Sequence, residues 1–77
     1  MLYILAFGST HKALKAENVL KEAGLSFRLL PAPKVLSAYC DLVISVDDLS
    51  TPVETLKKGG AVPKAIYRKE GEEYVKV

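Results

Sequence analysis

The fold is decided by residues 2–10, which read Leu-Tyr-Ile-Leu-Ala-Phe-Gly-Ser-Thr. Residues 2–7 are apolar and rich in β-forming side chains, which predicts a strand that is buried on at least one face. Gly8 interrupts this run, and the hydroxyl of Ser9 or Thr10 can accept a hydrogen bond from a free amide of the following turn. The stretch therefore predicts a strand that leads directly into the start of a helix.

An amphipathic helix of about 14 residues is predicted after Thr10, because apolar residues recur there at spacings of three and four. The apolar positions are Ala13, Ala16, Val19, Leu20 and Ala23. Gly24 is expected to end this helix, since glycine tolerates the left-handed backbone conformation that often follows a helix.

Further strands are predicted over residues 26–30, 42–46 and 64–69, with a short fifth strand over 73–77. One of Asp48, Ser50 or Thr51 is predicted to cap a second helix, which ends at Gly59-Gly60. Pro31 and Pro33 are expected to lie outside any strand ladder, because neither can donate a backbone hydrogen bond.

The element order β-α-β-β-α-β predicts an α+β fold, the ferredoxin-like two-layer sandwich. In that fold an antiparallel sheet has two helices on one face, and here a C-terminal strand would be added. A small open sheet with another strand order is the competing prediction. The length of 77 residues predicts one ferredoxin-like domain over residues 1–77.

Composition excludes several classes of protein. Hydrophobic residues make up 49% and charged residues 26%, which argues against a disordered chain. The single cysteine and the single histidine exclude a disulfide-stapled scaffold and a self-contained zinc site, so neither a metal nor another cofactor is expected. The net charge of +2 is too even for a nucleic-acid-binding arm, and nucleic acid is not expected as a partner.

The N-terminal apolar run, residues 1–7, is only seven residues long and has no basic leader, unlike a signal peptide. No later run approaches the roughly 18 residues of a membrane span. We therefore expect a cytoplasmic protein that does not enter a membrane, with a thiol that stays reduced.

The predicted topology brings two distant segments to one end of the sheet. The first and third strands are neighbours in the ferredoxin-like order, so residues 8–11 and the loop from Pro31 to Cys40 would share that end. The unpaired amides of a first helical turn carry partial positive charge, and a thiolate near them is favoured over the thiol. Cys40 is thus a candidate nucleophile, with Ser9, Thr10 and His11 nearby.

Each of these residues also has a structural interpretation. A free cysteine is more often a small buried hydrophobe, and the charge of Asp41 would oppose thiolate formation at Cys40. Ser9 and Thr10 are explained by helix capping alone. The first turn holds basic residues and no acid, which is typical of an anion site but also of a solvated helix face.

Two blocks of the sequence form a recognisable pattern. The first block runs Phe7-Gly-Ser-Thr-His11 and continues through residues 13–24. The second runs Leu30-Pro-Ala-Pro-Lys34 and continues to Cys40. In this order and at this separation, the two blocks resemble a family of small selenium/sulfur carrier-like proteins, and the resemblance extends to about Tyr67.

The resemblance implies a carrier that holds sulfur or selenium on Cys40 as a persulfide or perselenide. Ser9, Thr10 and His11, with Pro33 and Lys34 of the proline-rich loop, would line the site. The family's cysteine is typically followed by glycine, whereas Asp41 follows here.

The partners implied by this role are a cysteine desulfurase-type donor and an acceptor protein. Because the free sheet face of so small a domain needs covering, a homodimer is also expected. The alternative function is a non-catalytic small-anion-binding or regulatory module in which Cys40 is structural. Whether the protein is an enzyme is left open by the sequence.

Overall fold

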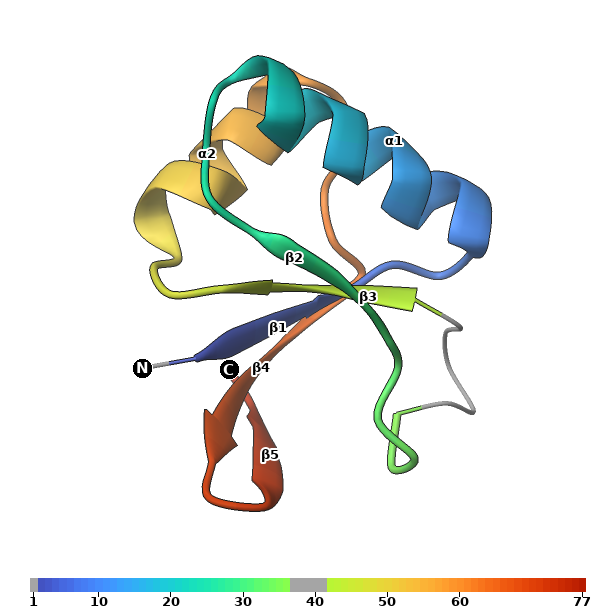
Figure 1. The fold of residues 1–77 in the computed structure, drawn as a ribbon, viewed down its shortest axis with the longest axis vertical. Helices are drawn as coiled ribbons and strands as arrows, with labels where there is room; N and C mark the ends of the chain where they lie inside the picture. Colours follow the sequence, from blue (N-terminus) through green and yellow to red (C-terminus); the bar gives the residue numbers. More distant parts are fainter. Residues whose placement is uncertain (1, 37–41) are drawn as a thin grey trace.

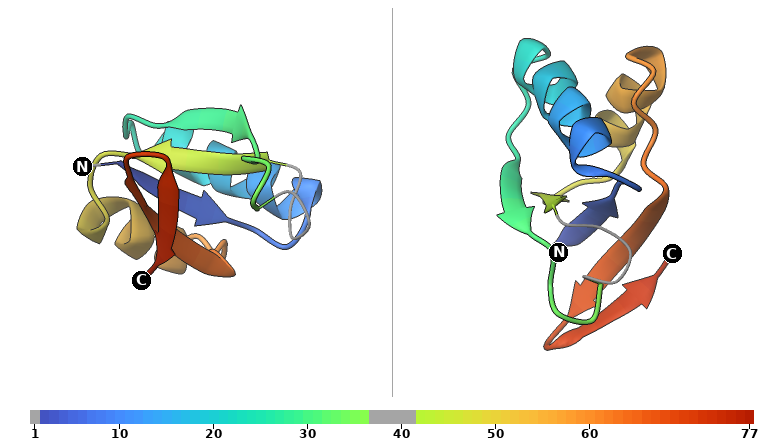
Figure 2. Two further views of the ribbon diagram at one scale, coloured as in Figure 1. Left: turned by 90° about the horizontal axis from the view of Figure 1, so that it is seen from below. Right: turned by 90° about the vertical axis from the view of Figure 1, so that its right-hand side faces the viewer.

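The computed structural model describes residues 2–36 and 42–77. Two helices lie side by side on one face of a single five-stranded sheet, so the described chain forms two layers (Figures 1 and 2). In chain order the elements are β1 (Tyr3–Ala6), α1 (Thr10–Glu22), β2 (Arg28–Pro31), β3 (Leu42–Val46), α2 (Ser50–Lys58), β4 (Ala65–Glu70) and β5 (Glu73–Lys76).

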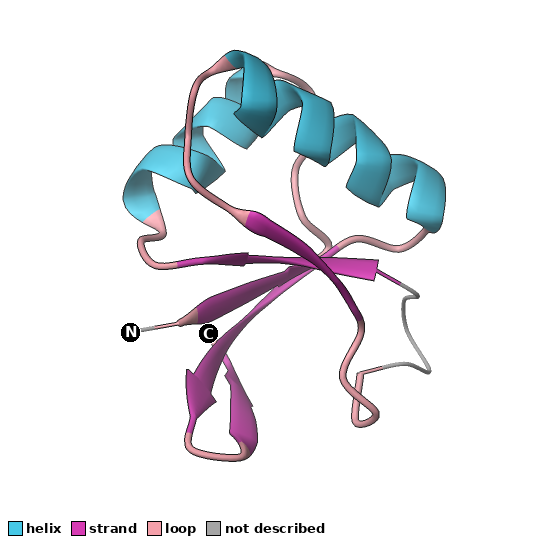
Figure 3. Ribbon diagram, viewed as in Figure 1, coloured by secondary structure: helices cyan, strands magenta, loops and turns pink. Residues whose placement is uncertain are grey.

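The sheet has the strand order β2-β3-β1-β4-β5, and every neighbouring pair is antiparallel. The first four of these strands have the ferredoxin-like order, and β5 extends the sheet beyond β4 as a hairpin (Figure 3). The predicted ferredoxin-like sandwich with an extra strand is therefore confirmed. The competing strand order is wrong.

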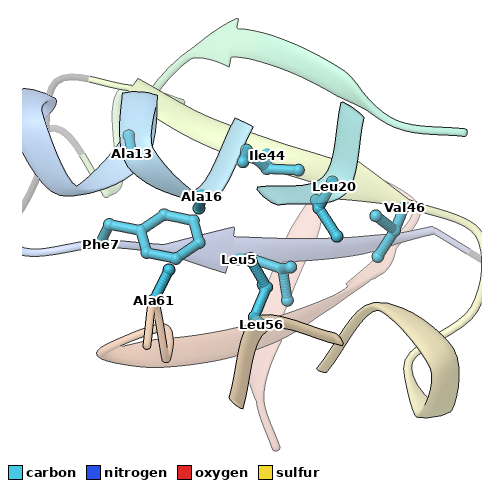
Figure 4. Packing of buried hydrophobic residues seen from close by; sticks show 9 residues of the cluster. All are labelled: Leu5, Phe7, Ala13, Ala16, Leu20, Ile44, Val46, Leu56 and Ala61. Carbon is cyan, nitrogen blue, oxygen red and sulfur yellow. The ribbon is translucent and has the colours of Figure 1, made fainter. Parts of the chain in front are cut away.

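The main core fills the space between the sheet and the helices. Alternate residues of a strand point to opposite faces, so Leu5 and Phe7 of the β1 segment meet the buried side of α1. Figure 4 shows nine buried members of this cluster: Leu5, Phe7, Ala13, Ala16, Leu20, Ile44, Val46, Leu56 and Ala61. The small residues of α1 allow the helix to lie close to the sheet.

The two helices also approach each other closely at the end of α2. A Cβ atom added to Gly59 would lie 2.6 Å from Cγ1 of Val19, which is inside any real carbon–carbon contact. Glycine at this position therefore allows α2 to finish against α1.

A second, smaller core lies on the face of the sheet turned away from the helices. Ile4, Ala6 and Val43 point to this face, and Leu36 from the loop after β2 packs onto them. In Figure 1 this loop and the β4–β5 hairpin both extend to that side of the sheet. The chain thus covers part of the face that was expected to be free, while the expected homodimer stays a prediction.

One local expectation changes. Pro31 was expected outside the ladder, but it is the last residue of β2 and pairs with Leu42. This expectation was wrong because β2 is an edge strand, where a proline can be accommodated without breaking a ladder on both sides.

Asp48, one of the three residues predicted to cap the second helix, bonds to the first turn of α2. Its Oδ2 accepts a hydrogen bond from the Thr51 amide at 3.3 Å, while the N-cap position itself is Leu49, whose side chain makes no capping bond.

Among the described residues, no helix has both the length and the apolar character needed to cross a bilayer.

We predict that Leu36→Ala lowers the free energy of unfolding by about 2–3 kcal/mol, because it removes a buried side chain that joins the loop to the sheet. Leu36 is 4% exposed, whereas its neighbour Val35 is 67% exposed. Val35→Ala is therefore the matched control and should change stability by less than about 0.5 kcal/mol. Urea unfolding measures both values. Equal effects would mean that the loop does not pack on the sheet in solution.

Candidate functional site

Two distant segments leave the sheet at the same end. Ala6 at the end of β1 pairs with Val43 of β3, and Pro31 at the end of β2 pairs with Leu42. The turn from β1 into α1 and the described part of the β2–β3 loop therefore start next to each other. The candidate nucleophile Cys40 lies within residues 37–41, outside the described residues.

Ser9 is the N-cap of α1. Its backbone is extended, with φ −157° and ψ 160°, and its Oγ accepts a hydrogen bond from the Lys12 amide at 3.2 Å. Its carbonyl oxygen accepts the Ala13 amide at 3.1 Å, which starts the helix. The capping role expected of Ser9 is therefore confirmed. The first turn of α1 contains no acidic residue.

A basic pocket lies between the start of α1 and the connection from α2 to β4. Its volume is about 460 Å³, and the described residues that line it are Phe7, His11, Lys12, Lys15, Gly60, Ala61 and Val62. Phe7 and Ala61 are buried, 1% and 7% exposed, and they give the pocket an apolar floor. The exposed side chains of His11, Lys12 and Lys15 stand around this floor. The Nζ of Lys15 reaches across to the connection, 3.8 Å from the place of a Cβ on Gly60.

The sequence predicts residues of the Pro31–Cys40 loop beside His11, whereas the structure places Gly60, Ala61 and Val62 there. The only signal for them was topological. The chain must return from α2 to the end of the sheet where β4 begins beside β1, and the Lys64 amide donates to the Ala6 carbonyl at 2.8 Å.

Pro33 and Lys34 lie on the opposite side of the sheet from this pocket. The Pro33 carbonyl accepts a hydrogen bond from the Leu36 amide at 2.8 Å, and Leu36 is buried on the face turned away from the helices. Residues 32–36 do not line the pocket of His11. The predicted site residues that the structure describes thus form two groups, one on each face.

The two described leucines that flank residues 37–41 pack on opposite faces of the sheet. Leu36 belongs to the smaller core, whereas Leu42 packs against the main core on the helix side. Cys40 stands in the sequence between these two leucines. Its role, like that of Ser9, Thr10, His11, Pro33 and Lys34 as a joint site, stays a prediction.

Within the described parts of the chain, no group of three or more His, Cys, Asp or Glu side chains is arranged to hold a metal ion.

The fold and the sequence together define the class of protein: a small α+β sandwich with a basic pocket at the start of its first helix. The chain belongs to the family described as "Putative Se/S carrier protein-like", which it matches over residues 2–68. The extra strand β5 lies outside the matched range. No curated protein and no solved structure matches the sequence.

The cap of α1 gives a test of how the site is positioned. Ser9→Ala removes the acceptor for the Lys12 amide and is expected to lower the free energy of unfolding by about 1 kcal/mol. Ser9→Asp keeps an acceptor and places negative charge at the helix N-terminus, so it should retain that stability. Both values follow from urea unfolding. If the two variants unfold at the same urea concentration, the side chain of Ser9 does not cap the helix.

Proposed function

We propose that this protein is a sulfur or selenium carrier that holds the chalcogen on Cys40 as a persulfide or perselenide. The observation that carries the proposal is the family match over residues 2–68, which includes the chain's single cysteine. The carrier would act in the cytoplasm, where an unpaired thiol stays reduced.

The loading step is a sulfane transfer without net oxidation. The Cys40 thiolate attacks the terminal sulfur of a persulfide, R–S–SH, on a cysteine desulfurase-type donor. The new bond joins the Cys40 sulfur to the sulfane sulfur, the donor's S–S bond breaks, and the donor cysteine leaves as a thiolate. Unloading repeats the step on Cys40, with a nucleophile of the acceptor protein as the attacking group. Selenium would follow the same sequence through an S–Se bond.

The surroundings of the end of β1 support this chemistry. The first-turn amides of α1 carry partial positive charge, and no acid in that turn reduces it. Lys12 and Lys15 add full positive charges, which favour a terminal persulfide anion over its protonated form. Asp41 acts in the opposite direction, because its carboxylate is bonded in sequence next to Cys40.

We predict that incubation with a cysteine desulfurase and L-cysteine adds one sulfur atom to the protein, and that selenocysteine adds one selenium atom. Intact mass spectrometry measures both additions. Because Cys40 is the single cysteine, a reductant-labile addition can only be on that residue. Cys40→Ser is the control and should gain nothing. If the wild-type protein gains neither atom while a known acceptor in the same tube does, the carrier function is wrong.

The pocket around His11 supports one other function, a small-anion-binding or regulatory module with a structural Cys40. The two functions differ in thiol reactivity. A carrier's Cys40 reacts with an alkylating agent in the folded state, whereas a structural Cys40 reacts only after denaturation. Binding of inorganic phosphate that survives Cys40→Ala would favour the module.

A further inference from the structure

Positive charge is concentrated at one end of the strands of this domain. At the end where β1 stops and α1 starts, the described charged residues include four lysines: Lys12, Lys15, Lys34 and Lys64. The opposite end carries most of the described acids, Glu22, Asp47, Asp48, Glu70, Glu72 and Glu73, together with four basic residues, Lys21, Arg28, Arg68 and Lys69. Both signs of charge are therefore mixed at that end, whereas the first end is positive.

We call the surface formed by Lys12, Lys15 and Lys64 the basic end. All three side chains are exposed, and none forms an ion pair with another described residue. Uncompensated like charges repel one another and cost stability. Such a cluster is therefore better explained by a negatively charged binding partner than by folding.

The basic end also exposes aliphatic surface. Val62 lines the pocket of His11 and is 58% exposed. The pocket floor of Phe7 and Ala61 is apolar as well. An apolar centre with a charged rim is the usual composition of a protein–protein interface.

We propose that the basic end docks onto an acidic surface of a partner protein, with a carboxylate side chain of that partner in the pocket between α1 and the α2–β4 connection. Lys12 and Lys15 pair with the carboxylate, and Val62 contacts aliphatic groups beside it. This inference rests on the proposed function, because a carrier must dock transiently on a donor and on an acceptor.

A protein fits this surface better than a nucleic acid or a second copy. Single-stranded nucleic acid is held by stacking on exposed aromatic rings, and the aromatic ring in this pocket, Phe7, is only 1% exposed. Two copies meeting through their basic ends would bring the lysines of each into repulsion. The aliphatic side chains beside the pocket would be of no use to inorganic phosphate.

The probe for this proposal is a fluorescent synthetic peptide of alternating Glu and Leu, titrated against the Cys40→Ser protein by polarisation. We expect binding that weakens with added salt, and a loss of about tenfold or more in Lys12→Glu/Lys15→Glu. The matched control is Lys21→Glu/Lys69→Glu, which makes the same change in net charge at the opposite end and should bind as before. Circular dichroism checks that both variants are folded.

A second comparison tests the aliphatic contact. Val62→Ser should weaken binding of the Glu-Leu peptide but leave binding of a Glu-Ser peptide unchanged, since Ser offers no aliphatic group to Val62. Equal losses for both peptides would overturn this part of the proposal.

Other outcomes would overturn the docking proposal as a whole. These are equal losses in the two double variants, tighter binding of poly-uridylate than of the Glu-Leu peptide, displacement of the peptide by inorganic phosphate at similar concentration, or self-association that the Lys12→Glu/Lys15→Glu variant abolishes. Because the titrations use protein without a thiol, they do not depend on persulfide formation. Failure of Cys40 to accept sulfur would leave their outcome unchanged, and the two proposals fail separately.

Discussion

The structure depends on the pairing of β1 with β3 on one side and with β4 on the other. This pairing buries β1 on both faces, so that Leu5 joins the main core while Ile4 and Ala6 join the smaller one. It also fixes where the segment after β1 lies. Phe7 becomes the floor of the basic pocket, and Ser9 becomes the cap of α1. The site is therefore an extension of the central strand rather than an independent loop.

The sequence predicted the ends of helices and the turns well at positions where the backbone conformation favours a single residue type. Gly24, Gly60 and Gly71 all have positive φ angles, of 72°, 71° and 62°, and each stands where the sequence predicts a helix end or a turn. The burial of Leu36 could not be predicted in the same way. A lone leucine in a proline-rich loop has no periodic pattern, and only the path of the loop across the sheet decides whether it is buried.

The site also contains one feature that depends on neighbouring residues and another that depends on the path of the whole chain. Capping by Ser9 depends on the next three residues, so the sequence was sufficient to predict it. The neighbours of His11 depend on how the chain returns from α2 to β4, about 50 residues further along. Topology predicted that residues 8–11 and the loop after Pro31 share one end of the sheet. It could not predict that residues 32–36 lie on one face of the sheet while the pocket lies on the other. The position of residues 32–36 depends on the packing of Leu36 against the sheet.

The arrangement of charge suits a carrier better than a permanent complex. An exposed lysine contributes little affinity to an interface, and salt screens that contribution further. Several lysines on one end nevertheless accelerate encounter with an acidic surface and orient the molecule as it approaches. A protein that must leave its donor in order to reach its acceptor needs fast association and modest affinity, because tight binding to either one would stop the exchange. In a domain of 8.4 kDa, concentrating charge at the end that carries the start of α1 supplies orientation without a large buried interface.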